Sequence, residues 1–168
     1  MSTTTRMTFA DFEKLPEYPG KQELLNGELI ELPPPKFRHM SLGKRFYELL
    51  RTIVEVSRLW IEGGYRIGDG WLIPDVSVSW PEQQPAEDYL TGSPMIAIEI
   101  ASPSNTGAQI DEKVVAYLEN GAAEVWIVYP KTHSMMVHVR ADMSARRYIS
   151  TYECALLGAM IPVGELLS

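Results

Sequence analysis

The sequence predicts an α/β domain in which helices flank a mixed β-sheet. Residues alternate between two faces over residues 71–80 and 96–101, which is typical of strands. Apolar residues recur at helical spacing over residues 39–58 and 107–120. The Asn26-Gly27 pair between two short apolar runs is a strong hairpin signal. Strands and helices therefore alternate along the chain, which favours the α/β class.

The first half of the chain is expected to begin with a short helix and a β-hairpin. A long amphipathic helix and two more strands follow. In chain order these elements cover residues 9–15, 22–25 with 28–32, 39–58, 65–67 and 71–80. Thr8 and Asp11 resemble a capping box for the first helix, and Pro16 ends it. Pro74 cannot donate to a sheet, so a strand edge or bulge is expected there.

The second half is expected to begin with a polar surface loop over residues 81–92. A strand, a helix and a second strand then form a crossover, which carries the helix back across Glu99. A hairpin and an apolar tail complete the chain. These later elements cover residues 96–101, 107–120, 125–129, 135–139 with 147–152, and 155–168. No repeat or linker divides the 168 residues, so a single domain over residues 1–168 is expected.

Two carboxylate residues, Asp75 and Glu99, lie within the predicted strands at residues 71–80 and 96–101. Glu99 alternates with isoleucines and has only alanines beside it on its own face, and Asp75 stands where its strand changes from apolar to polar. A buried charge is costly unless it is paired or binds a metal. Asp75 is therefore either a metal ligand or a strand-end aspartate with local hydrogen bonds. Glu99 is either a metal ligand or half of a buried ion pair.

The residue types favour magnesium, or manganese in its place, over zinc. Magnesium prefers one or two carboxylates together with water and phosphate oxygens. Lys113 lies on the crossover helix, from which it could reach the two carboxylates, orient a water molecule and stabilise negative charge on phosphorus. His133 and His138 do not form a metal-binding pattern, and the HExxH, CxxC, GxSxG and Walker A motifs are absent from the sequence.

Four further residues are possible accessories to this site. Glu23 and Glu28 in the hairpin could add a carboxylate, although exposed strand charge is the simpler interpretation. His39 could contact phosphate or be structural. Gln109 shares a helix face with Lys113. The basic residues of the long helix and the segment before it are either a solvated face or phosphate contacts: Lys36, Arg38, Lys44, Arg45 and Arg51.

The ordered set of motifs resembles the PD-(D/E)XK nuclease superfamily and, within it, the Uma-two family of restriction-endonuclease-like proteins. The matching text is Pro74-Asp75, the segment IEIASPS around Glu99, DEKVVAYLENGAAEVWIVYP, and the earlier TFADFEKLPE and QELLNGELIELPPP. The resemblance covers nearly the whole chain. It implies a restriction-endonuclease-like fold with an N-terminal β-hairpin, and metal-dependent cleavage of DNA. It also makes a homodimer plausible, since many enzymes of this fold cut twice.

By this resemblance Asp75 and Glu99 take the metal-ligand positions. The usual lysine two residues after the glutamate is replaced by Ala101, and Lys113 in the next helix fits its migrated position. Gln109 stands where the family often has aspartate, and Tyr129 replaces another aspartate. The departure at Gln109 keeps open a non-catalytic, binding or regulatory descendant of the fold. A carboxylate-pair hydrolase of another class, such as a glycosidase, is a third possibility.

Composition places bounds on these functions. The net charge is −7, which counts against an extended nucleic-acid footprint but leaves room for a local basic patch. A single cysteine, Cys154, excludes an internal disulfide and is expected of a cytoplasmic protein. Neither a secretion signal nor a membrane-spanning run is expected from the sequence. The composition, with 45% hydrophobic and 22% charged residues, is that of an ordinary globular protein.

Overall fold

The computed structural model describes residues 5–86 and 88–168. Its helices are α1 Phe9–Phe12, α2 Phe37–Leu50, α3 Gly107–Glu119 and α4 Val163–Leu166, with single 3₁₀ turns η1 at Val56–Arg58 and η2 at Pro130–Thr132. No helix within these described ranges has both the length and the apolar character needed to cross a bilayer.

The strands form two sheets and a separate hairpin. The first sheet has the order β2-β1-β5-β4-β7, from Glu28–Leu32, Lys21–Leu25, Gly70–Leu72, Tyr65–Ile67 and Leu90–Thr91. The second has the order β11-β10-β9-β8-β6-β3, from Ser144–Tyr148, Ser134–Val139, Glu124–Tyr129, Ile96–Ile100, Val76–Val78 and Leu59–Ile61. The hairpin pairs β12 Tyr152–Cys154 with β13 Ala159–Ile161.

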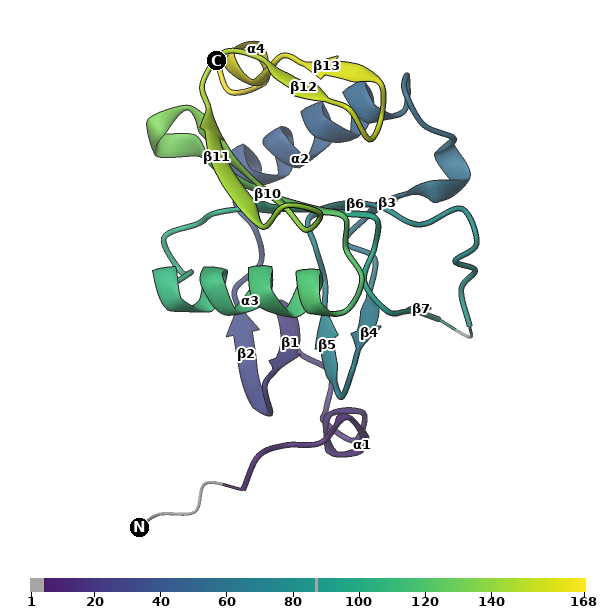
Figure 1. Ribbon diagram of the computed structural model, residues 1–168. Coiled ribbons are helices and arrows are strands. Elements are labelled where there is room, and N and C mark those ends of the chain that lie inside the picture. Colours follow the sequence, from purple (N-terminus) through teal and green to yellow (C-terminus); the bar gives the residue numbers. More distant parts are fainter. Residues whose placement is uncertain (1–4, 87) are drawn as a thin grey trace.

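The six-stranded sheet separates two hydrophobic clusters (Figure 1). On one side lie α2, α4 and the β12–β13 hairpin, which pack on alternate residues such as Ile98 and Trp126. On the other side lie α3 and the first sheet, which cover the intervening residues such as Ala97 and Val125. The alternation of side chains along each strand thus assigns Glu99 to the α3 side.

Two sequence predictions of local structure are confirmed. Residues 21–32 form the N-terminal hairpin, and its turn residues Asn26 and Gly27 have φ of 52° and 77°. The pair β8–β9 is parallel and α3 connects its strands, as the predicted crossover requires. Thr106 caps α3 through a capping box with Gln109, and Gly121 follows its end with φ of 112°.

Three predicted elements are shorter than the sequence suggests. The first helix, expected over residues 9–15, ends at Phe12. The helix expected over residues 39–58 ends at Leu50, and the chain then turns into β3, which pairs with β6. The strand expected over residues 71–80 is divided between the two sheets as β5 and β6. The break falls at residues 73–75, where Pro74 has no N–H and the Ile73 N–H donates to the side-chain carboxylate of Glu23 on β1 instead of to a backbone carbonyl. This break gives Asp75 its position between the sheets.

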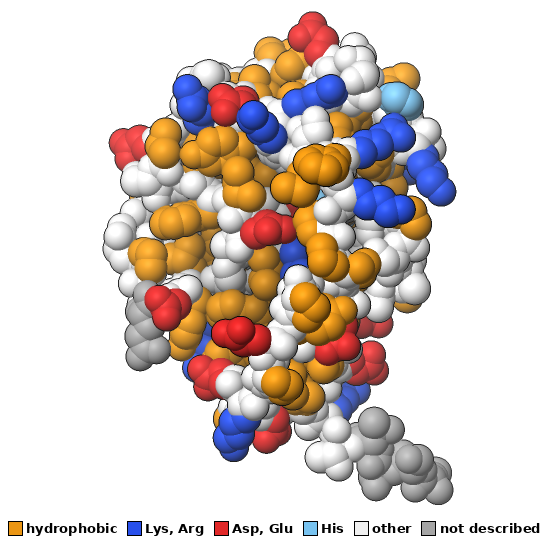
Figure 2. All heavy atoms as spheres, turned by 180° about the vertical axis from the view of Figure 1, so that it is seen from behind, with side chains coloured by type: hydrophobic (Ala, Val, Ile, Leu, Met, Phe, Trp, Pro, Cys, Tyr) orange, Lys and Arg blue, Asp and Glu red, His pale blue; other side chains and the backbone are white. Residues whose placement is uncertain are grey.

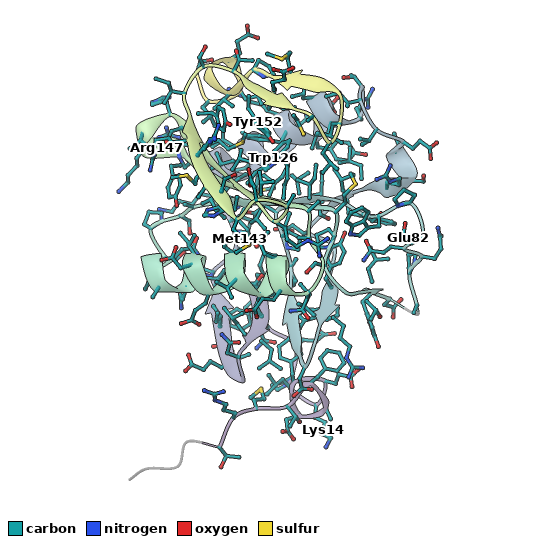
Figure 3. All side chains as sticks on the ribbon, in the orientation of Figure 1. Lys14, Glu82, Trp126, Met143, Arg147 and Tyr152 are labelled. Atoms are coloured by element: carbon teal, nitrogen blue, oxygen red, sulfur yellow. The ribbon has the colours of Figure 1, made fainter. Side chains whose placement is uncertain are left out.

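The C-terminal region also differs from the prediction. The strand expected over residues 147–152 is replaced by β11, which ends at Tyr148, and by the separate β12. A buried carboxylate, that of Glu124, holds β12 in place. Glu124 Oε1 accepts a hydrogen bond from the Tyr152 hydroxyl of β12 (2.9 Å), and Oε2 accepts one from Trp126 Nε1 (2.7 Å). Trp126 and Tyr152 lie close together beneath the hairpin (Figure 3), with ring centroids 5.8 Å apart.

Candidate functional site

A cavity of about 770 Å³ lies where the two sheets, α2 and the loop after β8 meet. Its wall includes the proline segment at residues 33–35, the first turn of α2, the loop at residues 101–105 and the turn after β9. Asp75 and Glu99 both line this cavity, although their residues are only 5% and 9% exposed. Two carboxylates from separate strand ends therefore line one cavity.

Asp75 is held by donors from three elements. The Ile100 N–H of β8 donates to its Oδ2 (2.7 Å). Lys21 Nζ of β1 and His39 Nε2 of α2 lie 2.9 and 3.0 Å from its Oδ1. Burial alone would raise the pKa of Asp75, but the His39 hydrogen bond and the Lys21 charge outweigh it and hold the pKa well below its usual range. The carboxylate is therefore ionised at neutral pH.

Glu99 belongs to a second, more deeply buried cluster. Lys113 Nζ lies 2.8 Å from Glu99 Oε1, and the Tyr117 hydroxyl donates to the same oxygen (2.8 Å). Lys113 and Tyr117 are four residues apart on α3 and so share the face that packs on β8. Lys113 Nζ also lies 2.9 Å from Glu23 Oε2, close enough for an ion pair but not aligned for a hydrogen bond. Glu23 is held in place by the Ile73 N–H, which donates to Oε1 (2.8 Å).

The protonation of this cluster follows from its burial and charges. Burial raises the pKa of Glu99, and the nearby Glu23 and Asp75 carboxylates add to this effect against the Lys113 ammonium. Burial opposes the charged form of Lys113, but Glu23 and Glu99 outweigh it and raise its pKa. Lys113 is therefore an ammonium group at neutral pH, and it cannot accept a proton from water.

The rim of the cavity is basic although the chain is acidic overall. Lys36, Arg38 and Lys131 line it, against one exposed acid, Glu62. On the face opposite to that of Figure 1, Lys and Arg side chains gather mainly in the upper half and acidic ones mainly in the lower half (Figure 2). Separated charges of this kind give a local positive field despite a net charge of −7.

Comparison with known proteins identifies the family. The sequence matches the family Uma2, described as "Putative restriction endonuclease", over residues 9–154. The chain belongs to the Uma2 family. Its fold is similar to that of a crystal structure titled "a putative nuclease belonging to DUF820 from Anabaena variabilis ATCC 29413", with a TM-score of 0.84, 20% sequence identity, and 96% of this chain and 97% of that chain covered. No curated protein matches the chain.

The Uma2 assignment and the structural match establish the restriction-endonuclease-like α/β fold that the sequence predicts. The family description makes the protein nuclease-like at the level of family. At 20% identity, the match to the Anabaena variabilis structure is evidence for the fold alone.

The Uma2 chain brings five of the seven predicted site residues together. Lys113 Nζ contacts the Glu99 carboxylate, and His39 Nε2 contacts the Asp75 carboxylate. Glu23 joins them as a fully buried residue, so the expectation that it is exposed strand charge is wrong. Its position on β1 places it under α3, and the Lys113 ammonium offsets the cost of its burial.

Glu28 and Gln109 lie away from this cluster. Glu28 is an exposed residue of β2, as the simpler interpretation expected. The Gln109 side chain accepts a hydrogen bond from the Thr106 N–H (3.1 Å) and so completes the cap of α3. Of the basic residues considered, Lys36 and Arg38 line the cavity, whereas Arg45 donates to the carbonyls of Leu166 and Ser168.

Sequence reasoning did not identify Lys21 or Tyr117 as site residues. Lys21 precedes Glu23 by two residues on β1, so the strand period places both on one face. That signal was present in the sequence, but it needed Glu23 to be recognised as buried. Tyr117 belongs to the apolar residues that recur at helical spacing over residues 107–120, and its hydroxyl contact with Glu99 depends on how α3 packs on β8.

The donor set of this Uma2 chain fits a hard divalent cation. Asp75 and Glu99 supply carboxylate oxygens at the cavity, and Glu99 Oε2 has no hydrogen-bond donor among the residues the structure describes. Three carboxyl groups, those of Asp75, Glu99 and Glu23, lie around the two ammonium groups of Lys21 and Lys113. Within residues 5–86 and 88–168, however, no three His, Cys, Asp or Glu side chains converge as a ready-made metal cluster. A cation would therefore need water and phosphate oxygens to complete its coordination, as Mg²⁺ commonly does.

Proposed function

We propose that the protein is a divalent-metal-dependent nuclease that hydrolyses phosphodiester bonds of DNA. One observation carries the proposal: Asp75 and Glu99, from separate strand ends, line the same basic-rimmed cavity. The Uma2 assignment supports a nuclease, and the hard oxygen donors support Mg²⁺ or Mn²⁺ as the cofactor. Asp75 and Glu99 would hold the cation.

The chain's own residues have distinct roles in this proposal. When bound, a divalent cation polarises a phosphoryl oxygen and makes water a better nucleophile. Lys21 and His39 keep Asp75 ionised and oriented. Lys113 and Tyr117 fix the carboxylate of Glu99, because both contact its Oε1. Lys36, Arg38 and Lys131 attract the phosphate backbone to the rim.

The decisive experiment compares wild type with Asp75→Asn and Glu99→Gln. Plasmid and single-stranded DNA are incubated with each protein in Mg²⁺, in Mn²⁺ and in EDTA. We expect metal-dependent cleavage by wild type and a loss of at least about 100-fold in both variants. Glu82→Gln in the exposed loop makes the same chemical change as Glu99→Gln and should retain full activity (Figure 3). Cleavage by both site variants at the wild-type rate would refute the assignment.

A non-catalytic nucleic-acid-binding protein is the second candidate. The observation that favours it is that both proposed ligands already have a lysine within 2.9 Å, Lys21 on Asp75 and Lys113 on Glu99. A cation must then compete with, or share oxygens with, these ammonium groups. DNA binding without cleavage, together with no heat of Mg²⁺ or Mn²⁺ binding in calorimetry, would favour this candidate.

A homodimer in the cytoplasm completes the proposal. The buried, free thiol of Cys154 supports a reducing compartment, and the resemblance to enzymes that cut twice supports a dimer. Light scattering on the purified protein tests the dimer: a mass near 18.9 kDa at micromolar concentration would contradict it.

A further inference from the structure

Two lysines pair with the carboxylates of the site, Lys21 with Asp75 and Lys113 with Glu99, and the structure distinguishes them. Lys113 has a side chain that is 5% exposed and lies between two carboxylates, Glu23 and Glu99, at 2.9 and 2.8 Å. Lys21 has a side chain that is 14% exposed and lines the cavity, whereas Lys113 does not. A ligand that enters the cavity therefore meets the ammonium group of Lys21 and not that of Lys113.

Lys21 also has a hydrogen-bond donor to spare. An ammonium group has three N–H donors. Lys21 Nζ donates to the Ile73 carbonyl (3.0 Å) and to Asp75 Oδ1 (2.9 Å), and its third donor has no partner among the described residues. The two existing bonds fix the position of the nitrogen, so the third donor is oriented before any ligand arrives. Preorganised donors of this kind bind and stabilise negative charge at low reorganisation cost.

The charge of Lys21 is secured by its neighbours. Its ammonium group forms an ion pair with Asp75 Oδ1 at 2.9 Å. The same oxygen that Lys21 contacts, Asp75 Oδ1, also contacts His39 Nε2 at 3.0 Å. Asp75 Oδ1 therefore keeps its contact with His39 when the Lys21 ammonium also interacts with a ligand.

We propose that Lys21 donates its third N–H to a non-bridging phosphate oxygen of the bound nucleic acid, and that it rather than Lys113 is the lysine in contact with substrate. This inference rests on the proposed function, because it places a phosphodiester in the cavity. Lys21 forms no covalent bond and transfers no proton. It stabilises the negative charge on the non-bridging oxygens as water attacks phosphorus, while Lys113 acts as a positioning residue through Glu99.

The first test measures binding without metal. A fluorescein-labelled DNA duplex is titrated in EDTA over a series of salt concentrations, and fluorescence anisotropy gives Kd. Lys21→Met should raise Kd about tenfold and reduce the slope of log K against log salt by about 1, as expected for one lost phosphate contact. Lys14→Met removes an equal charge from an exposed residue beside α1 that does not line the cavity, and it should change neither quantity (Figure 3).

The second test measures cleavage in Mg²⁺. Lys21→Met should lower kcat about 100-fold with a smaller change in KM, and Lys21→Arg, which keeps the charge, should recover at least about tenfold of that loss. Thermal unfolding by circular dichroism checks that each variant is folded at the assay temperature. If Lys21→Met is unfolded, Lys21→Gln and Lys21→Arg carry the comparison.

The outcomes separate this inference from the proposed function. If wild type binds DNA but does not cleave it, hydrolysis is refuted while the salt slope still reports on the Lys21 contact. If wild type cleaves and Lys21→Met retains both the slope and kcat, Lys21 is only the internal partner of Asp75 and the inference is wrong. It is equally wrong if wild type does not bind DNA, or if Lys14→Met reproduces the effect of Lys21→Met.

Discussion

The Lys113 ammonium group lies 2.8 Å from Glu99 Oε1, and both residues are buried, so a single ion pair joins α3 to β8 beneath the cavity. The same nitrogen lies 2.9 Å from Glu23 Oε2, which adds β1 to the junction. A cation shared by two buried carboxylates is costly to remove, because both anions then lose their partner. The site and the packing of α3 on both sheets therefore depend on the same group.

Lys113→Met is predicted to lower the free energy of unfolding by about 3–5 kcal/mol, as is typical when one partner of a buried ion pair is removed. Urea denaturation followed by circular dichroism measures this change. Lys44→Met, an exposed lysine on α2, is the matched control and should shift the value by no more than about 0.5 kcal/mol. A loss below about 1 kcal/mol for Lys113→Met would show that the ion pair contributes little.

His39 is predicted to titrate above its ordinary pKa of 6.5, since its hydrogen bond to Asp75 favours the charged ring. A pKa raised by folding contributes stability that is fully present below about pH 6.5 and is lost as the pH rises through the folded value. Proton NMR of the ring protons in EDTA measures the pKa, and Asp75→Asn should lower it. His138 is an internal control, because burial lowers its pKa below 6.5. A His39 pKa at or below that of His138 contradicts the prediction.

Gly43→Ala is predicted to stabilise the protein by about 0.5–1 kcal/mol, the difference in helix propensity between the two residues. Gly43 lies inside α2, and a Cβ there would lie 3.8 Å from the Ile100 side chain and 3.9 Å from Val76, which are ordinary contacts. Gly64→Ala is the contrasting variant, because its Cβ would lie 2.2 Å from the Trp71 ring and should destabilise the fold. Urea midpoints that move in the same direction for both variants would show that these contacts do not decide the outcome.

Glu124→Gln is predicted to destabilise the protein by about 1–3 kcal/mol and to loosen the β12–β13 hairpin. Both carboxyl oxygens of Glu124 accept hydrogen bonds, from the Tyr152 hydroxyl and Trp126 Nε1. An amide offers one acceptor oxygen, so one buried donor would lose its partner. Hydrogen exchange of the amides at residues 152–161 should speed up relative to those of α3. Unchanged hairpin exchange would mean that Glu124 does not anchor this layer.

Local patterns in the sequence were sufficient for several elements. Asn26-Gly27 predicts its hairpin because a type I′ turn needs two residues that tolerate positive φ. The period of the residues around Glu99 predicts a strand with two different faces. These features depend on residues close together in the chain. The same local patterns failed where β5 and β6 belong to different sheets, because alternation continues across the break at Pro74.

By itself, the sequence determined the residue types of the candidate site: two carboxylates in predicted strands, Asp75 and Glu99, and a lysine in the helix that follows, Lys113. It also determined the family to which the ordered motifs belong. Only the tertiary structure decided that Glu23 is buried, that Lys113 bridges it to Glu99, and that Lys21 lies on Asp75. The reason is physical. A residue's strand or helix period decides which way its side chain points, but its partners and its protonation depend on which other surface packs against that face.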